Sequence, residues 1–125
     1  MEPVRVLVVD DEAELVSALT ERLELRGFSA RGATSGEAAL EALRAGAWDV
    51  VLLDVRMPGI GGFELTRRIR QEHPDTAVVL LTGRTSADDE ETSRSAGAFA
   101  YLIKPIPIGR LEEALNAAAG RESDA

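Results

Sequence analysis

The sequence WDVVLLDVRMPGIGG, residues 48–62, is the most informative part of the chain. Its apolar stretch, residues 50–53, runs directly into Asp54 and then into Met-Pro-Gly at residues 57–59. A short run of branched apolar residues is typical of a strand buried on both faces, and the Pro-Gly pair ends such a strand. We therefore expect Asp54 at the carboxyl end of a buried strand, where a carboxylate is costly unless another group pairs with it or binds it.

The composition restricts the class of protein. A length of 125 residues suits one domain, and a hydrophobic content of 45% with only 4% aromatic residues predicts an aliphatic core. The net charge of −8 argues against direct nucleic-acid binding, which needs basic surface to neutralise phosphates. The absence of cysteine excludes a disulfide framework and a thiolate metal site.

The chain carries no signal for a membrane or for secretion. No apolar run approaches the roughly 18 residues that a membrane span requires. Residues 1–5 lack the charged and then apolar layout of a secretory signal. We therefore expect a soluble cytoplasmic domain that does not interact with membranes.

Five apolar runs alternate with five segments of helical character. The expected strands are residues 4–9, 28–31, 49–54, 76–81 and 98–103. The expected helices lie at residues 15–23, 38–43, 63–69, 87–96 and 107–118. This alternation predicts an α/β domain with a parallel sheet and helices on both faces. We expect a single domain over residues 1–125, with its core at about 4–119 and a frayed acidic tail at 120–125.

Capping residues suggest where three of the helices begin. Thr34 and Glu37 form a capping-box pattern before the second helix. Ser86 and Asp89 could cap the fourth helix. Pro107 is expected as the first residue of the last helix.

The strand ends carry the chemistry. The first strand ends at Asp10 and Asp11, the third at Asp54, the fourth at Thr82 and the fifth at Lys104. In an open parallel sheet the ligand crevice lies outside the carboxyl ends of the strands, where the strand order reverses. If the first and third strands are neighbours, three carboxylates meet there.

Three carboxylates that repel one another need compensating positive charge. A divalent cation with oxygen ligands and retained waters, such as Mg²⁺, would supply it, and Lys104 would add a second positive charge. Together with the Thr82 hydroxyl these groups describe a site for a phosphoryl group. One carboxylate could be the nucleophile that forms an aspartyl-phosphate, with positioning and charge neutralisation providing most of the catalysis.

Each residue alone also has an ordinary structural interpretation. Asp10 and Asp11 could cap the first helix, and Asp54 could be a turn residue. Thr82 could simply end a strand, and Lys104 could be a solvated charge. The presence of the required group at four separate strand ends favours the functional interpretation.

Four motifs make the sequence resemble a known family, the receiver domain of two-component response regulators. They are VLVVDDE at 6–12, LLDVRMPG at 52–59, LLTG at 80–83 and YLIKP at 101–105. The resemblance extends over about residues 4–118. It implies a flavodoxin-like, doubly wound (βα)5 fold with the five parallel strands in the order 2-1-3-4-5.

The resemblance implies roles for the acidic residues. Asp54 would be the phosphoacceptor, taking a phosphoryl group from a histidine kinase or a histidine phosphotransfer protein. Asp11 would bind Mg²⁺ directly and Asp10 largely through water. Asp54 and the backbone carbonyl of Arg56 would complete the metal site.

The resemblance also implies a switch. Thr82 would hydrogen-bond the phosphoryl group, Lys104 would bind a phosphoryl oxygen, and Tyr101 would turn inward when the threonine moves. Pro105 would follow Lys104 in a cis peptide bond, which an X-Pro bond permits.

Some positions depart from the common pattern of the family or vary within it. Gly83, Ile106 and Gly61 stand where alanine, phenylalanine and aspartate are frequent, and none of these changes removes a reactive group. By resemblance, Arg56 and Arg84 lie at places that modulate dephosphorylation in the family. We hypothesise that both arginines reach over the phosphoryl group and slow water attack, and the alternative is that both point into solvent.

The fourth expected helix, residues 87–96, has almost no large apolar side chain. Such a helix buries little, so we expect it to dock weakly and to shift on phosphorylation. The surface formed by the fourth helix, fifth strand and fifth helix would then be recognised by an output domain, an effector or a second copy of the chain.

Three functions are compatible with parts of the sequence. The preferred one is a signalling domain that is not an enzyme beyond assisting its own phosphorylation and dephosphorylation. A Mg²⁺-dependent phosphatase would commonly have Asp-x-Asp, whereas Arg56 occupies the second acidic position here. A receiver-like interaction domain without phosphate turnover is disfavoured by the intact set of Asp10, Asp11, Asp54, Thr82 and Lys104. Whether the chain is a single-domain regulator or part of a longer regulator or kinase stays open, as does its cognate kinase.

Overall fold

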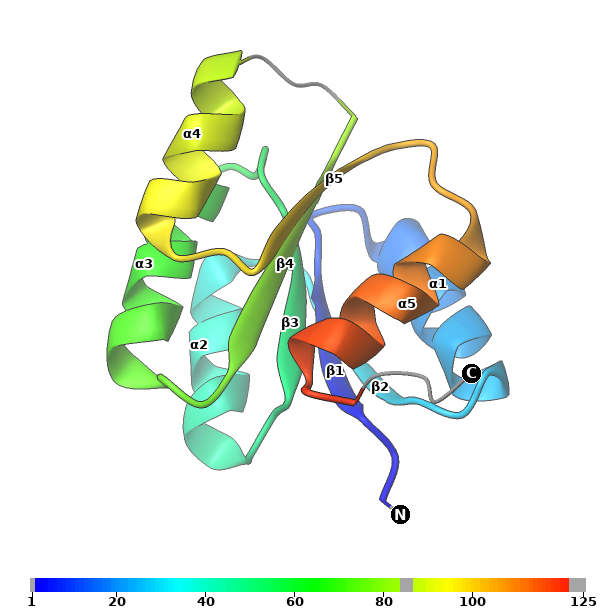
Figure 1. Cartoon of the computed structure of the whole chain (residues 1–125). Coiled ribbons are helices and arrows are strands. Elements are labelled where there is room, and N and C mark those ends of the chain that lie inside the picture. Colours follow the sequence, from blue (N-terminus) through cyan, green and yellow to red (C-terminus); the bar gives the residue numbers. More distant parts are fainter. Residues whose placement is uncertain (1, 84–86, 122–125) are drawn as a thin grey trace.

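The computed structural model describes residues 2–83 and 87–121, which form three layers (Figure 1). The strands are β1 (Arg5–Val9), β2 (Ser29–Ala33), β3 (Val50–Asp54), β4 (Ala77–Thr82) and β5 (Ala100–Ile103). The helices are α1 (Ala13–Leu25), α2 (Gly36–Ala45), α3 (Gly62–Glu72), α4 (Ala87–Ala96) and α5 (Ile108–Ala118). The strands pair in parallel in the order β2-β1-β3-β4-β5, which confirms the predicted fold.

The sheet separates two aliphatic cores. Figure 1 shows α1 and α5 on one face and α2, α3 and α4 on the other. Alternate residues of β3 serve the two faces: Val51 and Leu53 belong to the core under α2 and α3, and Val50 and Leu52 to the core under α1 and α5. All four are buried, as expected for the central strand of a parallel sheet.

The edge strands begin later than the sequence pattern predicts. The Phe28 N–H donates to the Leu23 carbonyl and closes the end of α1, so β2 begins at Ser29 and not at Phe28. The Ala98 N–H likewise donates to the Ser93 carbonyl and completes the turn after α4, so Ala98 lies outside β5, which begins at Ala100. In both cases a hydrogen bond to the end of the preceding helix uses the N–H of the residue, Phe28 or Ala98, that the sequence pattern assigned to the strand.

Two predicted helix starts are displaced by one residue. Ser35, and not Thr34, caps α2: its backbone is extended and its Oγ accepts from the Ala38 N–H at 3.1 Å. Pro107 is the N-cap of α5 and not its first helical residue, because its ψ of 143° is extended. Ser86, which we expected to help cap α4, lies outside the described residues.

The last described residues extend the end of α5. The N–H groups of Gly120 and Arg121 donate to the carbonyls of Ala117 and Asn116, so these two residues continue the helix end. The rest of the predicted acidic tail lies outside the described residues. Within residues 2–83 and 87–121, no helix has the length and apolar character needed to cross a bilayer.

Gly32 of β2 lets α1 approach the sheet. A Cβ at this position would overlap the Cγ1 methyl of Val16, which is buried on α1. Because protein interiors are close-packed, such an overlap forces a side chain off its rotamer or moves the helix. The helix that follows the acidic pair is therefore held by close contact with an edge strand.

Replacement of Gly32 by alanine is expected to lower the free energy of unfolding by about 1–3 kcal/mol, the usual cost of overpacking. Urea denaturation monitored by circular dichroism measures it. Gly109→Ala in α5 is the matched control, because its Cβ would meet nothing within 4 Å in the described structure and alanine favours a helix. Equal effects of the two substitutions would contradict the packing argument.

Candidate functional site

Register brings the acidic residues together. In the neighbouring strands β1 and β3, Val9 pairs with Leu53. The next residues along the two strands are Asp10 and Asp54, and Asp11 follows in the β1–α1 loop. Each of the three carboxylates has an oxygen within 4.8 Å of an oxygen of the other two. The structure thus gathers all three predicted acids at one point.

The three carboxylates differ in their surroundings. Asp10 is 6% exposed, Asp54 is partly buried and Asp11 is exposed. Asp10 Oδ1 accepts from the Glu12 N–H at 3.0 Å, and Asp54 Oδ1 accepts from the Arg56 N–H at 3.2 Å. These two bonds hold the loops that follow β1 and β3 against their own carboxylates.

The acidic pair does not cap the first helix. The N-cap of α1 is Glu12, whose side chain makes no capping hydrogen bond. Asp10 instead bonds the N–H of Glu12, which lies before the first helical residue. The structural alternative considered for this pair therefore does not account for its position.

Lys104 supplies positive charge from the first position after β5. Its side-chain Nζ lies 3.7 Å from Asp10 Oδ2, and its backbone N–H donates to the Thr82 carbonyl at 2.7 Å. The Lys104–Pro105 peptide bond is cis, as the resemblance implied. Asp10, Asp54 and Lys104 line one depression, whose apolar wall includes Leu15 and Leu19 of α1.

The two predicted switch residues belong to the adjacent strands β4 and β5. Thr82 is the last residue of β4 and is fully buried. Tyr101 of β5 pairs in register with Leu80 and packs against the core under α2 and α3. Both residues have interactions within the domain, so a movement of either one would exchange existing contacts for new ones.

The donor set fits a magnesium ion. Three carboxylate oxygens that lie within 4.8 Å of one another match the preference of a hard divalent cation for oxygen ligands. A buried carboxylate beside two others is unfavourable without positive charge, and the Lys104 ammonium approaches Asp10 at its Oδ2 oxygen. The residues of this chain therefore suit the ion that the sequence predicts.

The loop between β3 and α3 depends on Gly62, which the sequence interpretation missed. A Cβ there would lie 2.6 Å from Val55 Cα, 2.8 Å from Val55 O and 2.9 Å from Asp54 O. The Gly62 N–H also donates to the Val55 carbonyl at 3.1 Å. Because all these neighbours are backbone atoms, they cannot move without moving Asp54. The Gly61-Gly62 pair was the signal in the sequence.

Arg56 makes a contact that the sequence did not predict. Its Nη2 lies 3.6 Å from Asp89 Oδ2 in α4. The side chain is 59% exposed, yet it is directed to an acidic partner on a helix. Arg84 lies outside the described residues, and the hypothesis that these arginines slow dephosphorylation stays a prediction.

The fold and the site together define a class: a flavodoxin-like domain with an acidic cluster, a buried threonine and a lysine at the carboxyl edge of its sheet. A profile of the response regulator receiver domain matches residues 6–116. The chain therefore belongs to the receiver domain family of two-component response regulators, which confirms the resemblance seen in the sequence.

Three similar proteins illustrate the range of the family. The uncharacterized transcriptional regulatory protein YkoG of Bacillus subtilis is 38% identical over 94% of this chain and 52% of its own length. The virulence sensor protein BvgS of Bordetella pertussis is 40% identical over 94% of this chain and 10% of its own. The response regulator protein TrrA of Thermotoga maritima, solved in complex with Mg²⁺-BeF, is 34% identical with a TM-score of 0.82, covering 92% and 98% of the two chains.

Replacement of Gly62 by alanine is expected to destabilise the domain and to weaken Mg²⁺ binding, because the loop that positions Asp54 must move. Urea unfolding and calorimetric Mg²⁺ titration measure the two effects. Gly61→Ala is the control: its φ of −68° suits alanine, and its Cβ would meet nothing within 4 Å in the described structure. The packing argument fails if Gly62→Ala matches the wild type in both measurements.

Proposed function

We propose that this receiver domain accepts a phosphoryl group on Asp54 from a phosphohistidine donor, with Mg²⁺ bound at the same site. The observation that carries the proposal is the cluster of Asp10, Asp11 and Asp54 oxygens within 4.8 Å, with Lys104 Nζ 3.7 Å from Asp10. A carboxylate among cationic partners is suited to form an acyl phosphate, since both the nucleophile and the transferred group are anionic.

Each group of the chain has a distinct part in the transfer. An Asp54 carboxylate oxygen forms the bond to phosphorus while the bond from phosphorus to the donor nitrogen breaks. Lys104 offers an ammonium to a phosphoryl oxygen, and Thr82 offers a hydroxyl. When bound, Mg²⁺ supplies charge neutralisation for the phosphoryl oxygens.

The same proposal assigns the metal ligands. Asp11 and Asp54 would bind the ion directly, Asp10 largely through water, and Arg56 through its backbone carbonyl. The exposure of Asp11 and the burial of Asp10 support this division, because an exposed carboxylate can exchange water for a metal at little cost.

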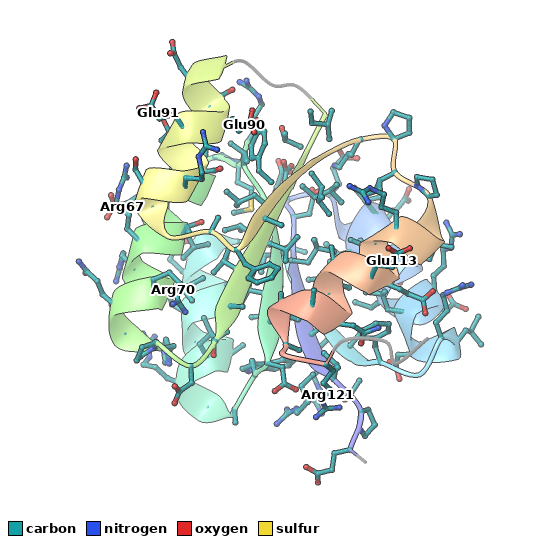
Figure 2. All side chains as sticks on the ribbon, viewed as in Figure 1. Arg67, Arg70, Glu90, Glu91, Glu113 and Arg121 are labelled. Atoms are coloured by element: carbon teal, nitrogen blue, oxygen red, sulfur yellow. The ribbon has the colours of Figure 1, made fainter. Side chains whose placement is uncertain are left out.

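The output surface lies on α4, β5 and α5. Over residues 88–96 of α4, the buried side chains are the small ones of Ser93 and Ala96, whereas Glu90 and Glu91 are exposed (Figure 2). Phe99 just before β5 and Ile103 within it remain 55% and 48% exposed. A helix docked by small side chains beside uncovered apolar residues suits a surface that changes its packing on phosphorylation.

The proposed partners follow from this surface and from the donor site. A histidine kinase or phosphotransfer protein would donate to Asp54, and an output domain, an effector or a second copy would bind the surface of α4, β5 and α5. The chain spans about half the length of YkoG and a tenth of BvgS, so it could work in either setting. We propose a cytoplasmic module, folded as one domain, that is not an enzyme toward external substrates.

Incubation with acetyl phosphate and Mg²⁺ is expected to add the mass of one phosphoryl group at Asp54, detected by mass spectrometry. Asp54→Asn should abolish the addition, and Asp11→Asn should slow it at limiting Mg²⁺. Asp75→Asn, in an exposed loop before β4, is the control and should leave it unchanged. Continuous release of phosphate without a modified Asp54 would favour a phosphatase, and no reaction would favour a domain that only binds partners.

Thr82→Ala is expected to retain phosphorylation at Asp54 but to lose the accompanying change around α4. The physical reason is that alanine lacks the hydroxyl that would draw this strand end toward the phosphoryl group. Nuclear magnetic resonance shifts of Tyr101 and α4, with and without acetyl phosphate and Mg²⁺, measure the change. Thr76→Ser, at the opposite end of β4, is the control. A normal response of Thr82→Ala would contradict the switch.

A further inference from the structure

An ion pair connects helix α4 to the loop that follows Asp54. Arg56 lies two residues after Asp54, in the loop between β3 and α3, and Asp89 lies in the first turn of α4. Their side chains approach to 3.6 Å between Nη2 and Oδ2. The backbone N–H of the same arginine donates to Asp54 Oδ1. Arg56 therefore contacts the proposed phosphoacceptor through its backbone and α4 through its side chain.

After phosphorylation, the Arg56 guanidinium could pair with either of two anions, the phosphoryl group on Asp54 or the Asp89 carboxylate. The phosphoryl group on Asp54 carries close to two negative charges in place of the single carboxylate charge, whereas Asp89 carries one. Arginine binds phosphate oxygens through a planar set of donors, which makes phosphate a strong competitor for it. The side chain is mostly exposed, so it is not held by packing and can change partner.

The Arg56–Asp89 ion pair is important because α4 is weakly docked. An exposed ion pair contributes little to a well-packed element. Helix α4, however, carries mostly exposed polar side chains and buries small ones. A small electrostatic restraint is therefore a larger share of what holds its first turn in place.

We propose that Asp89 is a positioning residue that holds the Arg56 guanidinium on α4 and away from the phosphoryl group. This inference rests on the proposed function of Asp54. The Asp89 carboxylate then shortens the life of phospho-Asp54 by competing for Arg56. In the phosphorylated domain the phosphoryl group in turn competes with Asp89 for the guanidinium and weakens the hold of Arg56 on α4. Arg56 thus forms a second connection from Asp54 to α4, separate from Thr82.

The first test needs no phosphorylation. Arg56→Ala and Asp89→Asn are each expected to raise hydrogen exchange of the α4 amides in the metal-free protein by up to about fivefold, the upper range for an exposed ion pair. The double variant should exchange no faster than the faster single variant. Asp88→Asn is the control, because it removes the same charge from the same helical turn. Additive effects, or effects equal to the control, overturn the proposal.

The second test follows the lifetime of phospho-Asp54 after acetyl phosphate is removed. Asp89→Asn is expected to lengthen it by up to about fivefold, and Asp89→Glu to restore the wild-type value. In the Arg56→Ala background Asp89→Asn should have no effect, since the residue through which it acts is gone. An equal change in both backgrounds overturns the proposal.

The two tests separate this inference from the proposed function. A chain that never takes a phosphoryl group on Asp54 overturns the proposed function and, with it, the effect on lifetime. Independent behaviour of Arg56 and Asp89 in the exchange measurement overturns the ion pair as a restraint even if phosphorylation is normal.

Discussion

Repulsion among three carboxylates is the interaction on which the rest of this structure depends. The parallel register of β1 and β3 puts Asp10 and Asp54 at the same level, and Asp11 follows at once. Their charges cannot separate without breaking that register, because both strands are buried and a slip would turn every side chain to the other face. Positive charge must come to the acids, and Lys104 brings it from the end of β5.

The distribution of side chains holds the acidic cluster firmly and leaves the α4–β5 side of the sheet more weakly packed. The acids lie at the ends of β1 and β3, two of the inner strands, and a backbone contact at Gly62 fixes the loop after β3. At the other side of the sheet α4 packs through small side chains, and β5 is an edge strand. When charge is added at the acidic cluster, α4 is therefore the element expected to change its packing, because few buried side chains hold it in place.

Some features were predictable because their signals are local. The strand β3 was predicted correctly because a short run of branched apolar residues followed by Pro-Gly favours a strand buried on both faces. The edge strands β2 and β5 were misplaced at their starts, because hydrogen bonds from the preceding helix ends compete for the same residues. The choice between Thr34 and Ser35 as cap could not be made, since both have a suitable hydroxyl and only backbone geometry distinguishes them.

The amino-acid order alone settled the family, the alternation of strands and helices, and the reactive groups that end four strands, since each of these depends on neighbouring residues. The tertiary structure decided which of those groups lie together, because strand order and register depend on how segments far apart in the sequence pair with one another. The pairing of Arg56 with Asp89 is of the second kind. Both residues are charged and partly or largely exposed, so no local pattern marks them as partners. Their contact exists only because α4 packs beside the loop after β3.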